Sequence, residues 1–384
     1  LRDAGHVPVI VAEQAAGTIA VEHGLEFHAL AGDIAELMRP GAPMVQMVEA
    51  GHLTVGSLRG YHRDERAWLE TIASAAGASD VVVGMPTAGY HALAVAADIG
   101  AHPVIAELQP LAPTRAFAPS GLGEVRVPRV LNRALGHIVD VAGWATIARD
   151  VNRARRGLDR PRTGNPTRGV RRLGAWSPTL VPRPDDWPAS ASVTGAWRLP
   201  TPTGWRPDVA LQRFLDAGEP PVYVGFGSMP TFSGTRVLTN ALLTGLAGHR
   251  IILAQGSTEQ ESDFEDVFVT GHVPHDWLFP RCAAIVHHCG AGTSHAALAS
   301  GTPSIPVPFT LDQPFWARRL SGLGVASAPV NPRHPDPNAV CAALAHVQTG
   351  QVRDRAAALA RHVAAEHGVE EQQFIASRLG HDLA

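Results

Sequence analysis

Lysine is absent from this 384-residue sequence, and all 32 basic residues are arginines. The absence excludes a lysine nucleophile and a lysine Schiff base. No basic run stands out except Arg168 to Arg172, and the formal net charge is −3. Because nucleic-acid-binding domains carry basic patches, we expect no nucleic acid among the partners.

Cysteines and long apolar runs are also scarce. Cys282, Cys289 and Cys341 form an odd and sparse set, which gives no disulfide framework and is typical of a reducing compartment. The sequence has no apolar run of 18 residues and no signal-peptide pattern. We therefore expect a cytoplasmic protein without a transmembrane segment.

The composition is that of a globular protein large enough for two domains. Charged residues make up 17% of the sequence and hydrophobic residues 45%. The segment 199–207 contains three prolines in nine residues, which stiffen the chain and block helix continuation. We predict a linker there, an N-terminal domain over 1–198 and a second domain from 208 onward.

Short apolar runs alternate with helical patterns in the N-terminal half. The predicted strands are 7–12, 25–30, 79–83 and 103–106, and the predicted helices are 17–22, 68–76, 89–99 and 131–155. This rhythm indicates an α/β fold with an open parallel sheet. Since the sequence begins on a helix end followed by a strand, we expect the first strand and loop of the domain to lie outside it. Residues 160–174, rich in arginine, are predicted to be a mobile loop.

A second strand–helix series follows the linker. Its predicted strands are 222–227, 251–255, 266–270, 283–287 and 304–309, and its last helices are 353–366 and 370–379. The first of these strands leads into Gly225-Phe226-Gly227-Ser228, which lacks the third glycine of a dinucleotide fingerprint and supports NAD binding only weakly. On physical grounds Ser228 is either a hydroxyl donor to a phosphate or part of a plain turn.

The run from Ile285 to Trp316 carries the strongest functional signal. An apolar strand is followed by His287, His288, Cys289 and Gly290-Ala291-Gly292-Thr293, and then by an alanine-rich helix that ends before Gly301 and Pro303. We predict Thr293 as the N-cap. The first turn of a helix offers unpaired N–H groups and the positive end of its dipole, and glycines let a ligand approach closely. The sequence thus predicts a phosphate or pyrophosphate site that needs no lysine.

A zinc site at the same place is the competing interpretation. His287, His288, Cys289 and Cys282 are residue types that bind zinc. Adjacent histidines at a strand end, however, should point to opposite faces, and no second ligand group with metal spacing lies nearby. We therefore expect His288 to donate to a pyrophosphate oxygen, alongside the amides of Gly290, Gly292 and Thr293.

Asp312 and Gln313 follow the next predicted strand. Their side chains are of the kind that holds sugar hydroxyls, although an Asp-Gln pair before Pro314 can also cap a turn. A phosphate cradle and a hydroxyl-binding pair one βαβ step apart suggest a nucleotide-sugar.

These residues resemble a known family. His288-Cys289-Gly290 with Gly292-Thr293 and Asp312-Gln313 resembles the donor-binding signature of the inverting, UDP-glycosyltransferase-like GT-B enzymes, in the bacterial natural-product and sterol glucosyltransferase-like branch. Residues 222–229 look like the first strand and loop of that family's C-terminal domain. Residues 271–280 look like the segment that receives the base.

The resemblance implies two Rossmann-like domains with parallel sheets facing an interdomain cleft, with donor binding over 208–366 and a final helix at 367–384 packed back on the N-terminal domain. In it, Gly227 and Ser228 face the pyrophosphate, His272 packs on the base, and the Val273 backbone pairs with the base edge. Asp312 and Gln313 hold the sugar. No metal or other cofactor is required, and a UDP- or dTDP-sugar is the cosubstrate.

The activity implied is transfer of a hexose, with inversion, to a hydroxyl of a small acceptor such as a secondary metabolite (an antibiotic) or a lipid-like alcohol. The family's general base, His or Asp in the first N-terminal loop, is expected outside this sequence, and no Asp stands near Gly84 to complete a dyad. His91 and Glu107 are weaker candidates. The alternatives are N-acetylhexosaminyl transfer to an aminocyclitol, carbohydrate or lipid-linked acceptor, a non-catalytic nucleotide-sugar-binding protein, and a GT-B epimerase.

Overall fold

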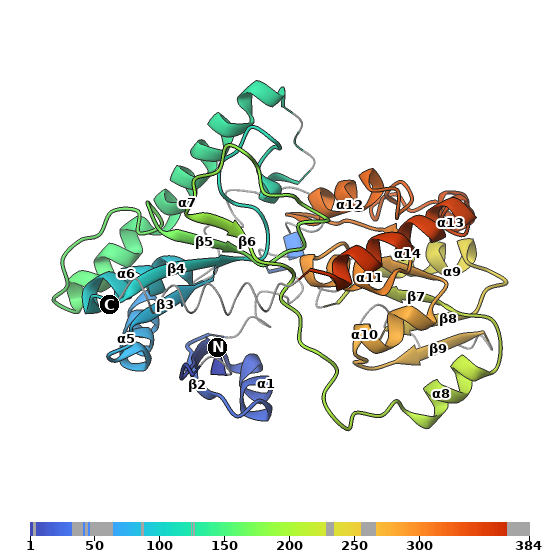
Figure 1. The fold of residues 1–384 in the computed structure, drawn as a ribbon, viewed down its shortest axis with the longest axis horizontal. Helices are drawn as coiled ribbons and strands as arrows, with labels where there is room; N and C mark the ends of the chain where they lie inside the picture. The colour runs from blue at the N-terminus through green and yellow to red at the C-terminus, as the bar shows by residue number, and fades with distance from the viewer. Residues whose placement is uncertain are drawn as a thin grey trace.

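The computed structural model describes residues 1–2, 5–32, 41–42, 45–46, 64–85, 88–123, 125, 127–227, 234–254 and 266–366. Parallel sheets flanked by helices form two lobes, one from each half of the chain (Figure 1). The predicted α/β class is confirmed. The boundaries at 198 and 208 stay predictions, and the helix expected at 367–384 lies outside the described residues.

The N-terminal lobe is built on a four-stranded parallel sheet in the order β3-β4-β5-β6. Its strands are β3 (Val81–Gly84), β4 (His102–Glu107), β5 (Arg171–Gly174) and β6 (Ala191–Val193). Its helices are α5 (Glu65–Ala76), α6 (Gly89–Ile99) and α7 (Arg129–Gly157), with a 3-10 turn η3 (Ser120–Leu122). A separate parallel pair joins β1 (Val9–Glu13) and β2 (Glu26–Leu30), which are connected by η2 (Gln14–Ala16) and α1 (Gly17–Glu22).

Local signals explain most of these elements. The Asp64 carboxylate caps α5 by accepting from the Ala67 amide, and α6 ends at Gly100, whose φ of 74° lies in the left-handed region. The buried faces of these two helices pack together over the sheet around Trp68, Leu69 and Val95. Hydrophobic periodicity is thus sufficient to predict these two helices and their buried faces.

The prediction of a mobile loop over 160–174 is wrong at its C-terminal end, because residues 171–174 form strand β5. Strand periodicity was hidden by its two arginines. Arg172 lies in the strand and forms an ion pair with the buried carboxylate of Glu107 on β4. A segment whose arginines suggested a solvent-exposed loop is therefore part of the sheet.

The C-terminal lobe has a five-stranded parallel sheet in the order β11-β10-β7-β8-β9. Its strands are β7 (Val222–Gly225), β8 (Ile251–Ala254), β9 (Val267–Thr270), β10 (Ala284–His287) and β11 (Ser304–Pro306). Its helices are α8 (Val209–Asp216), α9 (Thr235–Gly245), α10 (His275–Leu278), α11 (Ala291–Ser300), α12 (Gln313–Gly322), α13 (Pro337–Val347) and α14 (Gly350–Ala364), with η4 (Phe279–Arg281) after α10.

The central strands of this sheet are buried on both faces. Every residue of β7 and β10 is buried, which accounts for their continuous apolar runs. Strand β11 ends at Pro306, three residues earlier than predicted, since Pro306 and Pro308 cannot donate to a neighbouring strand.

The two lobes share an apolar contact. Trp176, Trp187 and neighbouring residues pack in one cluster with Phe315 and Trp316 of α12, and with apolar residues of α11 and α14. The loop after β4 reaches the same helix, where the Phe117 and Phe315 rings lie 5.3 Å apart (Figure 1). The segment 199–207 is tied to α10 by the amide and hydroxyl of Thr201, which both donate to Asp276.

Candidate donor-binding site

The strand order of the C-terminal sheet defines where a ligand should bind. Counted along the chain, its strands lie in the order 3-2-1-4-5, so the direction of winding reverses between β7 and β10, which are hydrogen-bonded neighbours. In open parallel sheets the ligand crevice lies outside the carboxyl ends of the two strands at such a switch point. The glycine loop after Gly225 and the His288–Gly290 loop both leave the sheet at this position.

His288 connects the two loops at the switch point. Its ring lies between the backbones of Gly227 and Gly290: a Cβ on Gly227 would be 3.1 Å from its Cε1, and a Cβ on Gly290 would overlap its Nε2. Gly227 has a φ of 59°, which also favours glycine there. The structure thus brings together three of the predicted residues, whereas Ser228 lies outside the described residues.

The first turn of α11 opens beside the His288 ring. Gly290, in extended conformation, is the N-cap, and the helix begins at Ala291. The prediction of Thr293 as N-cap is therefore wrong: glycine at the cap lets the helix start three residues earlier, and no side chain caps it. The first intrahelical bond runs from the Ser294 amide to the Gly290 carbonyl. The three preceding amides, Ala291 to Thr293, have no acceptor within the helix.

Space is open on the same turn. A Cβ on Gly292 would meet no atom within 4 Å, and Gly292 is exposed. Since Cα–Cβ bonds of a helix tilt toward its N-terminus, this open space lies on the side of the free amides. The geometry is that of an anion site: unpaired N–H groups, a positive dipole end and access to the backbone.

Buried polar atoms gather around this turn. His287 Nε2, His288 Nδ1, Ser294 Oγ and His295 Nε2 are buried and make no hydrogen bond within the described part of the chain. Such atoms are rare in folded proteins, and together they indicate a place built for polar chemistry. Burial lowers the pKa of His288 to about 4, so the ring is neutral at pH 7.

Asp312 and Gln313 stand at the start of α12, beyond the end of β11. The Asp312 carboxylate accepts a 2.7 Å bond from Trp316 Nε1, and burial raises its pKa above the ordinary value. Gln313 Oε1 accepts from the amides of Phe309 and Thr310 at 2.8 and 3.2 Å. The side-chain carbonyl of Gln313 therefore braces its own loop, a contact that the sequence did not predict.

Trp316 has two roles. It is completely buried and packs in the core, and it also donates to Asp312. The i, i+4 spacing of residues 312 and 316 at a helix start was the available signal. Its ring also contacts His295 of α11, with centroids 5.1 Å apart, so α11 and α12 meet beside the site.

The segment predicted to receive the base follows β9. His272 is exposed and Val273 is buried. The next histidine, His275, stacks on Phe279 with centroids 4.3 Å apart, and burial lowers its pKa to about 4. Trp277 packs against Trp205 of the 199–207 segment, with ring centroids 5.1 Å apart.

The competing zinc interpretation gains no geometric support. No group of three His, Cys, Asp or Glu side chains suited to a metal ion occurs within the described ranges. Cys282 and Cys289 are buried, and burial raises the pKa of both thiols, that of Cys282 to about 12. His287 Nδ1 accepts a bond from the Cys289 amide.

The two weaker candidates for a general base are held in buried pairs. His91 is completely buried, and its Nε2 bonds the Glu65 carboxylate. Glu107 is paired with Arg172, and burial raises its pKa although the arginine opposes this. Neither side chain reaches solvent, so neither is placed to take a proton from an acceptor.

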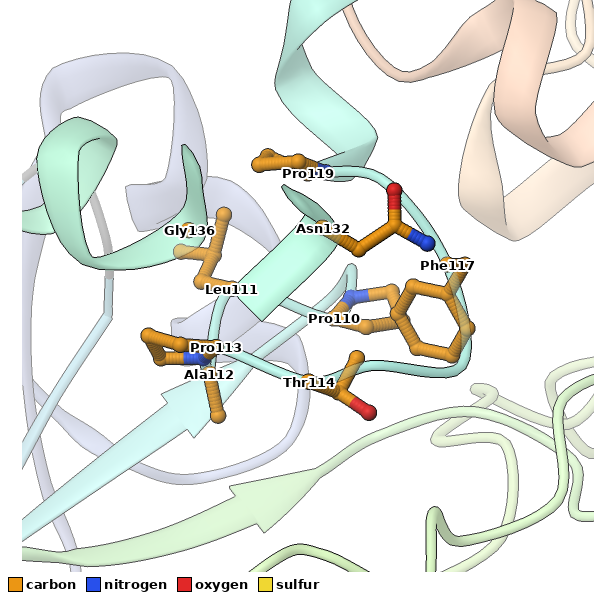
Figure 2. Close-up of a pocket in the computed structure, with 9 residues that line it drawn as sticks. All are labelled: Pro110, Leu111, Ala112, Pro113, Thr114, Phe117, Pro119, Asn132 and Gly136. Carbon is orange, nitrogen blue, oxygen red and sulfur yellow. The ribbon is translucent and has the colours of Figure 1, made fainter. Parts of the chain in front are cut away.

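Figure 2 shows a small pocket in the N-terminal lobe between the loop after β4 and the first turns of α7. It is lined by Pro110, Leu111, Ala112, Pro113, Thr114, Phe117, Pro119, Asn132 and Gly136. The volume open to the centre of a water molecule is about 10 Å³, enough for about one water. This pocket is too small for a substrate.

Comparison with known structures places the fold in a class. The chain superposes on the solved structure of the kitacinnamycin glycotransferase with a TM-score of 0.70, at 18% identity, covering 98% of this chain and 92% of the other. Together with the two parallel-sheet lobes, this likeness defines a GT-B fold. Within the described residues, no helix is both long and apolar enough to cross a membrane.

Sequence comparison then identifies the family. The chain is 32% identical over 397 residues to O-mycaminosyltylonolide 6-deoxyallosyltransferase of Streptomyces fradiae, covering 96% of this chain and 90% of that protein. It is 35% identical over 268 residues to sterol 3-beta-glucosyltransferase UGT80A2 of Arabidopsis thaliana, covering 66% of this chain but only 41% of the plant protein's length. Residues 245–375 match the family described as erythromycin biosynthesis protein CIII-like, C-terminal domain. The chain belongs to the GT-B glycosyltransferases of this natural-product and sterol glucosyltransferase-like family.

Proposed function

We propose that this glycosyltransferase moves a hexose, with inversion, from a UDP- or dTDP-sugar to a hydroxyl of a small lipophilic acceptor, an antibiotic-like secondary metabolite or a lipid-like alcohol. The observation that carries the donor assignment is the free first turn of α11 beside His288 at the topological switch point. A diphosphate placed there accepts from the amides of Gly290, Gly292 and Thr293 and from the His288 ring. Gly227 and Ser228 contribute from the facing loop.

The same contacts explain how the site promotes the reaction. As the acceptor hydroxyl attacks the anomeric carbon, the bond to the diphosphate breaks and negative charge grows on the leaving oxygen. Fixed N–H groups and a helix dipole stabilise that charge most when it is fully developed, which lowers the barrier. Such a site supplies the stabilisation that a metal ion provides in other enzymes, so the proposed reaction uses no metal.

The remaining proposed residues contact the sugar and the base of the donor. Asp312, half-buried and oriented by Trp316, accepts from hydroxyls of the sugar, and Gln313 shapes the loop on which the sugar rests. His272 and Val273 follow β9 at the carboxyl edge of the same sheet and receive the base. A general base must take the acceptor proton, and among the described N-terminal residues His91 and Glu107 are excluded by their buried pairing.

Isothermal titration with UDP and with dTDP tests the donor site. We expect one of them to bind with a dissociation constant in the micromolar range, and Gly292→Ala to abolish most of that affinity. A Cβ at position 292 meets no protein atom, so this variant should fold as the parent does. Absence of binding at millimolar concentrations of both nucleotides would remove the proposal.

A mass-spectrometric screen of sugar nucleotides against hydroxylated acceptors tests the transfer. Product masses of acceptor plus a hexosyl unit support hexose transfer, and acceptor plus an N-acetylhexosaminyl unit supports the alternative donor. Nucleotide binding without any transfer across the screen would favour a non-catalytic binding protein.

A further inference from the structure

The loop that carries His288 contains a strained residue. Cys289 has a φ of 62°, in the left-handed region that residues with a side chain seldom adopt. Among the described residues only Asp159 and Leu311 share this property without being glycine. Leu311 lies in the loop after β11, so two of the three strained residues flank the proposed donor. Strain of this kind persists only where surrounding contacts enforce it.

His287 supplies the enforcing contact at Cys289. It is the last residue of β10, completely buried, and paired in the sheet with Gly225 on one side and Pro306 on the other. Its Nδ1 accepts a 3.2 Å bond from the Cys289 amide. Its carbonyl accepts a 2.8 Å bond from the Val307 amide and a weak 3.7 Å contact from the Cys289 thiol.

This arrangement fixes the protonation of the ring. An Nδ1 that accepts from an amide carries no proton, so the proton of the neutral ring is on Nε2. Burial, together with the neighbouring His288 and His275, lowers the pKa of His287 to about 3. The acceptor is therefore retained at every pH at which the enzyme would work.

The consequence reaches the donor site through the backbone. The left-handed turn at Cys289 directs the chain from the strand into the extended Gly290 and then into α11. It also sets the His288 ring between Gly227 and Gly290. If the turn relaxed, both the ring and the free amides of the helix start would move.

We propose that His287 is a positioning residue for sugar-nucleotide binding: its buried ring does not touch the donor but accepts from the Cys289 amide and so holds the strained turn that orients His288 and the α11 amides. The inference rests on the proposed function for its effect on the donor. Replacing His287 by an aliphatic or an amide side chain of similar size distinguishes the effect of the hydrogen-bond acceptor from the effect of the ring's volume.

A double-mutant cycle with an isosteric rescue tests this role. His287→Asn keeps an acceptor oxygen at the place of Nδ1, and His287→Leu removes it. Cys289→Gly removes the conformational penalty of the turn, because glycine adopts a positive φ freely. The readouts are thermal unfolding without ligand and UDP or dTDP affinity by titration, for wild type, the three single variants and His287→Leu/Cys289→Gly.

We expect His287→Leu to lower the unfolding temperature and to weaken nucleotide binding about tenfold, the effect of one lost hydrogen bond. His287→Asn should stay close to wild type. The effect of His287→Leu should shrink when measured on the Cys289→Gly background, since the turn then needs no support. The same loss on both backgrounds, or a loss in His287→Asn equal to that in His287→Leu, would overturn the role.

The two proposals fail separately. If the wild type binds neither nucleotide, the proposed function fails, while the unfolding measurements still report whether His287 holds the turn. If the wild type binds but the cycle shows no coupling between positions 287 and 289, only the positioning role is lost.

Discussion

The imidazole of His288 occupies the space beside the Gly290 Cα that a side-chain carbon at position 290 would take. Glycine is therefore required at this position for a reason separate from helix capping. The same ring edge also faces Gly227, where a Cβ would stand 3.1 Å from Cε1. Two glycines from two loops thus define the position of one histidine at the switch point.

This contact predicts different outcomes for two neighbouring glycines. Gly290→Ala should displace His288, lower the unfolding temperature and weaken UDP or dTDP binding by roughly 10–100-fold, the range for losing hydrogen bonds to a charged group. Gly292→Ala should weaken binding with no loss of stability, since alanine favours helix and meets no atom. Titration calorimetry and thermal unfolding of both variants provide the comparison. A Gly290→Ala protein that binds as the parent does would contradict the described packing.

The Asp312–Trp316 bond predicts a separation of sugar recognition from nucleotide recognition. Asp312→Ala should reduce turnover of the sugar nucleotide far more than it reduces affinity for the free nucleoside diphosphate, because the proposed role of the carboxylate is to accept from hydroxyls of the sugar. Trp316→Phe removes the donor to Asp312 together with part of a buried ring, so it should lower the unfolding temperature and also raise the KM for the sugar nucleotide, by a smaller factor than Asp312→Ala. Steady-state kinetics and titration with UDP or dTDP measure the two quantities. Equal losses in both for Asp312→Ala would show that its role has been misassigned.

The low pKa of His288 predicts proton uptake on binding. A diphosphate beside the ring favours its charged form and must raise the pKa above about 4. At a pH between the pKa of His288 in the free protein and its pKa in the complex, binding therefore takes up a proton. The contribution of His288 to affinity grows as the pH falls through the raised pKa. Titration at about pH 5.5 in buffers of different ionisation enthalpy measures the uptake. His288→Gln keeps a hydrogen-bond donor but cannot titrate, so an uptake unchanged in this variant would place the proton elsewhere, for example on the nucleotide.

A carboxylate at the end of α14 links the two lobes. Glu366 Oε1 accepts from the Ser177 hydroxyl at 2.7 Å and from the Thr179 amide at 3.1 Å. Glu366→Ala should lower the free energy of unfolding by about 1–3 kcal/mol, as expected for two lost bonds to a charged group. Urea denaturation measures the change, with Asp354→Ala as the control, since Asp354 is exposed on the same helix. An equal effect of both substitutions would show that Glu366 contributes only its charge.

The three thiols should differ in reactivity. Cys341 is exposed, whereas Cys282 and Cys289 are buried with raised pKa values. Because the thiolate is the reactive form, a chromogenic disulfide reagent at pH 8 should modify one thiol in the native protein and three after denaturation. Cys341→Ser should leave the native protein unreactive. Rapid reaction of a second thiol would show that the loop around Cys289 opens readily.

Several features were predictable because they depend on short stretches of chain. The helix Gly89–Ile99 and the buried strands of the C-terminal sheet follow from hydrophobic pattern, and each was predicted within a few residues of its observed bounds. The glycines around His288 and the Asp312–Gln313 pair were likewise visible as a motif. Their assignment to donor contacts stays a prediction.

Other features were not predictable because they depend on partners distant in sequence. Strand β5 contains two arginines and exists because Arg172 meets Glu107, 65 residues earlier. The same pairing removed Glu107 from the candidates for a general base.

The sequence by itself determined that this is an α/β protein in which a glycine-bearing helix start follows a strand and two adjacent histidines, because glycine and apolar periodicity act over a few residues. Only the tertiary structure decided that the helix starts at Ala291, that His288 lies between Gly227 and Gly290, and that His287 braces a strained turn. Those facts depend on strand order and on the close approach of backbones from separate loops. No local pattern encodes such distances, because they arise when the parallel strands assemble.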